Sequence, residues 1–217
     1  MKKFQRLHLV IAIILLGSCG SNNQSVIVSD SFNSEIITSN RNKLQNILTK
    51  QMIAKVMDIA ENKIEVHIEN NIYQKGQYTV SYSWPTGKKK KVGGGKFEID
   101  EYNSISIGFV KQTNFSDFEK QYGSKEGLQM QVDAMAKQAD FNKEIGTAEA
   151  KYIADYAKTR RVEKLENIAT AAFWEAPMNA LHILAKDVAF TLTTNWGDDE
   201  KLAKQKAIEI LNAIINP

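Results

Sequence analysis

Apolar residues recur at helical spacing in two well-separated parts of the chain. Residues 44–48 and 53–60 carry Leu, Ile, Val, Met and Ala at three- and four-residue steps, which is typical of amphipathic helices. Thr49 is placed to cap the second segment. The clearest pattern covers residues 198–216, whose acidic first turn, Asp198 to Glu200, suits the positive end of a helix dipole. Its predicted buried face consists of Leu202, Ala203, Ala207, Ile210, Leu211, Ile214 and Ile215.

Alternation of apolar and polar residues predicts strands between these helices. The first strand has an apolar side of Ile64, Val66 and Ile68 and a polar side of Glu65, His67 and Glu69. The later strands are short apolar runs with turn-sized gaps between them. The strands expected on this basis are residues 64–69, 77–84, 97–99, 104–110, 168–174, 180–184 and 188–194.

A basic, glycine-rich stretch separates two of these strands. It contains Lys88, Lys89, Lys90 and Lys91 and, shortly after, three consecutive glycines. Glycine-rich polar stretches favour loops, so we expect a flexible basic loop here. Two further helices are expected over residues 116–142, broken near Gly123, and over residues 147–158.

The succession of elements predicts an α+β fold, an antiparallel sheet with helices packed on it. The order of helix, antiparallel strands and helix occurs twice, which suggests two related halves, residues 41–142 and 143–217. The last fifty or so residues combine Ala171, Phe173 and Trp174 with two short strands and a terminal helix. This ending is similar to the small α/β sandwiches of the PsbP/Mog1 kind, which implies the same layered arrangement.

The chain opens with the pattern of an export signal. Lys2, Lys3 and Arg6 precede an apolar run from Leu7 to Leu16, which is shorter than the roughly 20 residues of a spanning helix. Gly17, Ser18 and Cys19 complete a stretch that resembles a bacterial lipobox. The resemblance implies cleavage before Cys19 and fatty acylation of that residue. An ordinary cleaved signal or a simple N-terminal anchor is the alternative.

These observations divide the chain into three parts. Residues 1–18 are the expected signal peptide, residues 19–40 the lipidated N-terminus and a Ser- and Asn-rich flexible tether, and residues 41–217 a single globular domain. The tether contains a short apolar island around Val26. The alternative for this island is that it docks on the domain as an edge strand. Gly20 follows Cys19 where some inner-membrane lipoproteins carry Asp, which favours the outer membrane.

The balance of charged residues limits the partners that are expected. The chain has 28 basic and 25 acidic residues, and the three excess positive charges are those of the expected signal. A nucleic-acid binder needs a net basic face, so no nucleic-acid partner is expected. Cys19 is the single cysteine, which leaves the domain without disulfides or cysteine-based metal sites.

The candidate chemistry is sparse, and no cofactor is expected. His67 and His182 are the two histidines outside the expected signal. His67 lies between Glu65 and Glu69, at a spacing that suits metal ligands, but such a face is more often the wet side of a strand. His182 is interpreted as a partly buried strand residue with a hydrogen-bond partner, and no metal site is predicted.

Aromatic and basic residues supply the remaining candidates. Trp84 and Trp174 are expected in the core and Trp196 at the surface. The lysines Lys88 to Lys91 suit phosphate headgroups or an acidic polymer, with a solvated hairpin tip as the alternative. Lys88, Lys89, Lys90, Lys91 and Trp196 are therefore the candidate binding residues.

The sequence thus predicts a lipid-anchored cell-envelope lipoprotein with a non-catalytic binding domain. The membrane, through lipid on Cys19, and an envelope protein are the expected partners. The alternatives are a carrier of a small apolar ligand and an unrecognised envelope hydrolase. A site that joins His67 or His182 to a carboxylate favours the hydrolase.

Overall fold

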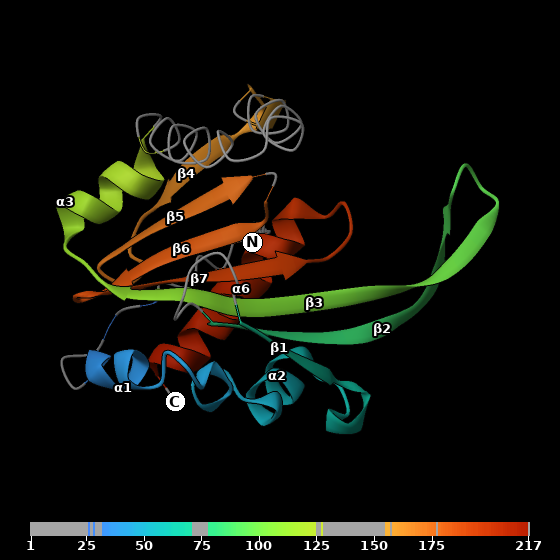
Figure 1. Cartoon of the computed structure of the whole chain (residues 1–217), viewed down its shortest axis with the longest axis horizontal. Coiled ribbons are helices and arrows are strands. Elements are labelled where there is room, and N and C mark those ends of the chain that lie inside the picture. The colour runs from blue at the N-terminus through green and yellow to red at the C-terminus, as the bar shows by residue number, and fades with distance from the viewer. Residues whose placement is uncertain are drawn as a thin grey trace, which may run out of the picture.

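Seven strands form one antiparallel sheet, in the order β1-β2-β3-β7-β6-β5-β4 (Figure 1). The structure is a computed structural model that describes residues 26, 28, 32–70, 78–124, 127, 155, 156, 158–176 and 178–216. The strands are β1 (Glu65–Asn70), β2 (Tyr78–Val92), β3 (Phe97–Gln112), β4 (Arg161–Leu165), β5 (Ala171–Ala176), β6 (Ala180–Ala185) and β7 (Val188–Asn195). Together with the helices packed on the sheet, this confirms the expected α+β class.

Helices cover both faces of the sheet. One face packs against α6 (Glu200–Ile215), α2 (Lys50–Met57) and the short elements α1 (Ser34–Ser39) and η1 (Leu44–Asn46). A third short turn, η2 (Glu61–Lys63), leads into β1. The opposite face packs against α3 (Phe115–Phe118) and the π-helical turn η3 (Glu119–Gly123). The two apolar clusters are separate because alternate residues of β5, β6 and β7 point to opposite faces.

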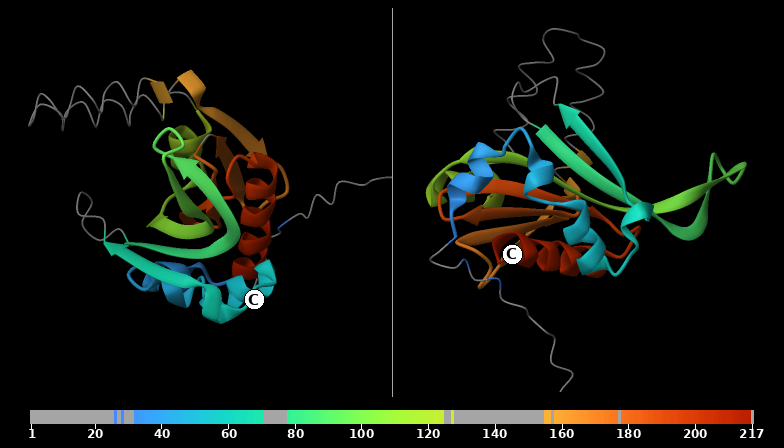
Figure 2. Two further views of the ribbon diagram at one scale, coloured as in Figure 1. Left: turned by 90° about the vertical axis from the view of Figure 1, so that its right-hand side faces the viewer. Right: turned by 90° about the horizontal axis from the view of Figure 1, so that it is seen from below.

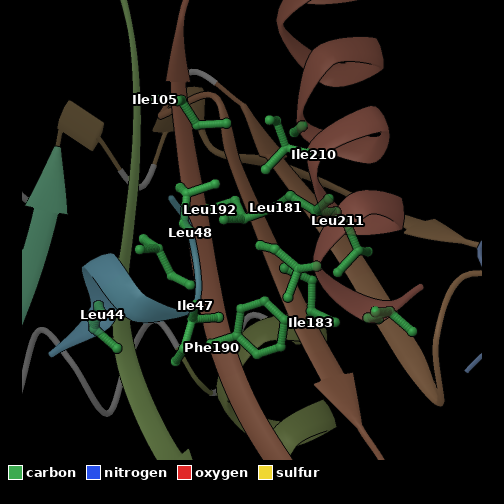
Figure 3. Packing of buried hydrophobic residues seen from close by; sticks show 14 of the residues in the cluster. Leu44, Ile47, Leu48, Ile105, Leu181, Ile183, Phe190, Leu192, Ile210 and Leu211 are labelled. Atoms are coloured by element: carbon green, nitrogen blue, oxygen red, sulfur yellow. The ribbon is translucent and has the colours of Figure 1, made fainter. Parts of the chain in front are cut away.

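The larger cluster lies between the sheet and α6. Ile210 and Leu211 of α6 point toward Leu181, Ile183 and Leu192 of the sheet (Figure 3). The helix begins as its sequence predicts, since the Asp199 side chain accepts a hydrogen bond from the Leu202 amide. Leu202 itself, expected in the buried face, is only half-buried.

The α2 helix also begins where the sequence predicts. The Thr49 hydroxyl accepts from the Met52 amide at 3.1 Å, which satisfies one of the free donors of the first turn. Just before it, the Leu48 carbonyl accepts from the Tyr82 hydroxyl. Burial raises the pKa of Tyr82 to about 12, so this phenol stays protonated and ties the helical segment to β2.

The N-terminal segment packs on the domain from Val26 onward, whereas the domain was expected to begin at residue 41. Val26 is fully buried and forms a parallel bridge with Ile168, and the Ala169 amide donates to the Val26 carbonyl at 2.6 Å. Val28 and Phe32 pack against the core, and Ile37 of α1 lies within it. A flexible tether over residues 19–40 is therefore wrong for its second part. Burial of these apolar side chains outweighs the polar composition around them. Val26 is docked, as the alternative held, but through an isolated bridge and not as an edge strand of the sheet.

The expected basic loop is also wrong. Lys88 to Lys91 belong to β2, and β2 and β3 continue as one long hairpin whose turn is formed by Gly93 to Lys96. Two cross-strand pairs, Lys89 with Asp100 and Lys91 with Glu98, place opposite charges next to each other, which favours pairing. The positive φ of Gly93, Gly94 and Gly95 allows the tight reversal.

The two halves that the sequence suggested, residues 41–142 and 143–217, do not pack in equivalent ways. The helical segment after β3 packs on one face of the sheet, whereas α6, after β7, packs on the other. Trp84 lies on β2, directly beside β3, but Trp174 lies on β5, with β6 between it and β7. Both tryptophans are buried core residues, as expected, without being counterparts.

Candidate functional site

A buried polar cluster, which we call the His182 cluster, lies on the face of the sheet that carries α3 and η3. It consists of Arg160, Glu175, His182 and Thr191, with Tyr122 and Tyr156 at its border. His182 Nδ1 lies 2.9 Å from Thr191 Oγ1, and His182 Nε2 lies 3.0 Å from Glu175 Oε2. His182 is 8% exposed and Thr191 5%.

The strands position these groups by their register. His182 faces Thr191 across β6 and β7, and Phe173 across β5. Glu175, two residues beyond Phe173, therefore shares the same face of the sheet and reaches the imidazole from the side. The alternation that buries Trp174 and Leu181 on the α6 face thus places His182 and Glu175 on the opposite one.

Arg160 joins the cluster to the chain before it. One of its terminal nitrogens donates to Glu175 Oε2 at 3.0 Å and to the Tyr122 carbonyl at 3.3 Å, and the other donates to the Ser124 carbonyl at 3.1 Å. The second oxygen of Glu175 accepts from the Tyr156 hydroxyl. The guanidinium therefore caps the end of η3, where backbone carbonyls lack helical partners.

Electrostatics fix the proton positions in the cluster. Burial lowers the pKa of His182, and Arg160 lowers it further, while Glu175 acts in the opposite direction. A neutral imidazole beside a carboxylate must donate through Nε2, because an ionised carboxylate only accepts. Nδ1 then accepts from the Thr191 hydroxyl. The resulting order of carboxylate, imidazole and hydroxyl resembles a nucleophilic relay.

The surroundings of this relay favour a structural role. The Tyr122 ring stacks on the imidazole with centroids 4.1 Å apart, and burial raises the pKa of Tyr122 to about 12. The Lys111 ammonium lies 5.7 Å from the same ring, and it donates to the Gln121 side chain. Burial lowers the pKa of Lys111. Aromatic covering and low exposure keep the Thr191 hydroxyl away from a substrate carbonyl.

The second candidate is the free part of the β2–β3 hairpin, residues 84–103, which we call the ribbon. β1 pairs with β2 only up to Ser83, and β7 pairs with β3 only from Ser104. The ribbon therefore extends from the sheet as two strands, as Figure 1 shows at the right, and Figure 2 shows it curling away from α6. Phe97, at its turn, is 65% exposed.

The expected binding residues divide between the ribbon and its base. Lys88, Lys89, Lys90 and Lys91 are all exposed on the ribbon, as the sequence led us to expect. Trp196 lies at the base instead and is half-buried, with its ring edge-on to Trp84 at 5.7 Å between centroids. Trp196 is thus not the exposed aromatic residue that was expected, and Phe97 and Ile99 are the exposed apolar residues nearest to the lysines.

His67 does not assemble a metal site. It lies on the edge strand β1, with Glu65 Oε2 3.7 Å from its Nε2, and both side chains are more than half exposed. In the part of the chain that the structure describes, no three His, Cys, Asp or Glu side chains are grouped to hold a metal ion. Val66 and Ile68, expected on a buried side, are exposed on the edge strand β1.

The signal and Cys19 lie outside the described residues. Within those residues, the structure contains no helix that is both long and apolar enough to span a membrane. Comparison with known proteins gives no match to a family model, to a curated protein or to a solved structure. The similarity of the ending to PsbP/Mog1-like sandwiches therefore stays a prediction, and the function must be inferred from the chain itself.

Proposed function

We propose that the protein is a lipid-anchored lipoprotein of the bacterial cell envelope, with a non-catalytic α+β domain that binds an envelope partner. The lipobox-like stretch ending at Cys19 supports the anchor. Outer-membrane location is proposed from Gly20, as above. The binding element of the domain is the ribbon.

The geometry of the ribbon carries this proposal. Two-stranded ribbons are marginally stable in water unless a further strand, a helix or a partner covers them. Phe97 and Ile99 are exposed there beside Lys90 and Lys91. Apolar side chains surrounded by charges on a projecting element are typical of interaction sites. The lysines add long-range attraction to an acidic surface.

The rival functions have weaker support. The order of Glu175, His182 and Thr191 is the observation that favours a hydrolase. The cap that Arg160 forms on η3 and the stacking of Tyr122 explain the same cluster as a structural one. The space between the sheet and α6 is occupied by one continuous cluster of buried side chains, which gives no support to an apolar ligand held there.

Two measurements test the proposal. Intact mass and membrane fractionation should show acyl groups on Cys19 and loss of anchoring in Cys19→Ala. A photo-crosslinking residue at Phe97 should capture a defined envelope component in living cells, and the same residue at Met178, which is also exposed, should not. Equal capture at the two positions, or capture at neither, contradicts binding through the ribbon. Hydrolytic activity that is lost in Thr191→Val but retained in Phe97→Ser would favour the hydrolase.

A further inference from the structure

The docking of Val26 limits how far the domain can stand from a lipid on Cys19. Seven residue steps separate Cys19 from Val26. A fully extended chain covers about 3.3–3.6 Å per residue, so this segment reaches at most about 25 Å. A flexible chain of that length has a root-mean-square span of roughly 13–16 Å. An anchored domain therefore keeps the end that holds Val26 within about 25 Å of the lipid.

Several elements identify that end of the molecule. Val26 pairs with Ile168, in the connection between β4 and β5. The Ser34 hydroxyl, at the start of α1, donates to Asp187 in the turn between β6 and β7, at 2.6 Å. The Thr113 amide, just after β3, donates to the Asp187 carbonyl. The N-terminal segment, the β6–β7 turn and the last residue of β3 thus lie together.

The ribbon lies at the other end of β3. That strand has 16 residues, which corresponds to about 50 Å at ~3.3–3.4 Å per residue. Figure 1 shows α1, α3 and the end of β3 on the left and the tip of the ribbon on the right. A connecting segment of at most about 25 Å thus keeps the end that holds Val26 close to the lipid. The ribbon, at the other end of β3, lies far from the lipid.

The end that holds Val26 exposes large apolar side chains. Ile36 of α1 is 57% exposed, and Phe115, at the start of α3, is 43% exposed. Phe109 is also exposed, at a β-bulge between Gly108 and Lys111. Its φ of 57° is an uncommon conformation for an aromatic residue. Arg41 and Lys43, exposed directly after α1, can reach phosphate headgroups.

We infer that this end is a membrane-seating surface, which rests in the interfacial region of a phospholipid bilayer. The layer on one face of the sheet contributes Ile36 and the layer on the other face contributes Phe115, together with Phe109 of β3. The inference rests on the proposed lipid anchor. Aromatic and aliphatic side chains gain free energy by leaving water for the interface, and each partial burial adds to the hold of the acyl chains. Contact through the membrane-seating surface orients the domain so that the ribbon points away from the anchoring membrane.

Depth-dependent fluorescence quenching tests this orientation. The native lipidated protein is purified with Phe115→Trp, Ile36→Trp or Phe97→Trp. Each variant is reconstituted in vesicles of phosphatidylcholine and phosphatidylglycerol, with and without chain-brominated phosphatidylcholine. The signal of the unsubstituted protein, which contains Trp84, Trp174 and Trp196, is subtracted. We expect bromine to quench the tryptophans at positions 36 and 115 and to leave the one at position 97 unaffected.

The other outcomes overturn the inference. Quenching at 97 alone shows that the ribbon inserts into the bilayer, and equal quenching at all three positions shows no preferred orientation. Absence of quenching at 36 and 115 shows that the domain stands clear of the lipid. A long Gly-Ser insertion after Gly20 is the matched control. It lengthens the segment between Cys19 and Val26 and should therefore reduce quenching of the tryptophans at positions 36 and 115.

The intact mass of the same preparation separates the two proposals. An unmodified Cys19 refutes the lipid anchor itself. An acylated Cys19 combined with unquenched tryptophans at 36 and 115 refutes only the seating surface.

Discussion

At the scale of single residues, His182 contributes to the dependence of stability on pH. The pKa of His182 is lowered in the folded protein, so the unfolded chain binds a proton at a higher pH than the folded one does. Stability from this group is therefore complete above the ordinary histidine pKa of about 6.5. It decreases as the pH falls below that value toward the folded pKa.

The first prediction follows from this linkage. The free energy of unfolding in urea should fall between pH 7 and pH 5, and His182 should contribute a slope of at most about 1.4 kcal/mol per pH unit. His182→Asn should remove that contribution and leave the slope due to carboxylates. His67→Asn, at an exposed position, should keep the slope of the unsubstituted protein. Identical slopes in all three proteins would show that His182 titrates normally.

The second prediction compares a buried ion pair with an exposed one. Glu175→Ala leaves the Arg160 guanidinium buried without its carboxylate and should lower the free energy of unfolding by about 3–5 kcal/mol. Glu163→Ala removes the pair with Lys204, in which the Glu163 side chain is more than half exposed, and should cost about 1 kcal/mol or less. Urea unfolding of both variants measures the difference. Similar losses would mean that solvent reaches the His182 cluster.

The sequence predicted part of this cluster. His182 within an apolar strand is expected to have a hydrogen-bond partner, and the structure shows two. The sequence did not indicate that Glu175 and Arg160 belong to the cluster. Glu175 stands at the end of an apolar run, and Arg160 follows an expected helix. Arg160 reaches Glu175 because β4 pairs with β5, and Glu175 reaches His182 because β5 pairs with β6. Neither can be obtained from the spacing of residues.

At the scale of elements, α6 closes the larger core. Most of its buried face follows from the sequence, because the pattern of period 3.6 is long and uninterrupted. Asp199, which was expected within the first turn, is the N-cap instead. A hairpin tip was the alternative for Lys88 to Lys91, but the extension of β2 through these lysines was missed for the opposite reason. Four consecutive lysines have no alternation, and the pairing of Lys89 with Asp100 and of Lys91 with Glu98 is visible only once the register of β2 and β3 is known.

The third prediction concerns α6. Leu211 is fully buried, and Leu211→Ala should lower the free energy of unfolding by about 2–5 kcal/mol through lost contacts and the cavity left behind. Lys201→Ala, at an exposed position of the same helix, should change it by about 0.5 kcal/mol or less. Lys204 is a poorer control because its ammonium donates to Glu163. Equal effects of the Leu211 and Lys201 substitutions would show that α6 is not docked on the sheet.

At the scale of the whole molecule, stability is distributed unevenly along the long axis. β6 is fully buried and lies between β5 and β7, with helical elements on both faces. The ribbon has neither a third strand nor a covering helix among the described residues. Local opening should therefore be far easier in the ribbon than in the sheet.

The fourth prediction is a map of amide hydrogen exchange. Amides of β6 should exchange only through global unfolding, and amides in residues 86–101 should exchange much faster, through local opening. A bound partner should slow exchange in the ribbon and leave β6 unchanged. Ribbon amides as protected as those of β6 in the isolated protein would indicate that another molecule, or a second copy, already covers them.

The single bridge at Val26 also bears on how the molecule responds to force. A pull on an acyl anchor is transmitted to the sheet through the Val26–Ile168 contact before it reaches α1. Release of the chain as far as Asn33, the cap of α1, also requires loss of the packing of Val28 and Phe32 and of the hydrogen bond from Lys186 to the Phe32 carbonyl. That release adds about 25 Å of reach at 3.3–3.6 Å per residue. The strands and α6 stay intact during this extension. The proposed lipid attachment would thus have two lengths, and rupture of the N-terminal contacts would absorb a load before the domain unfolds.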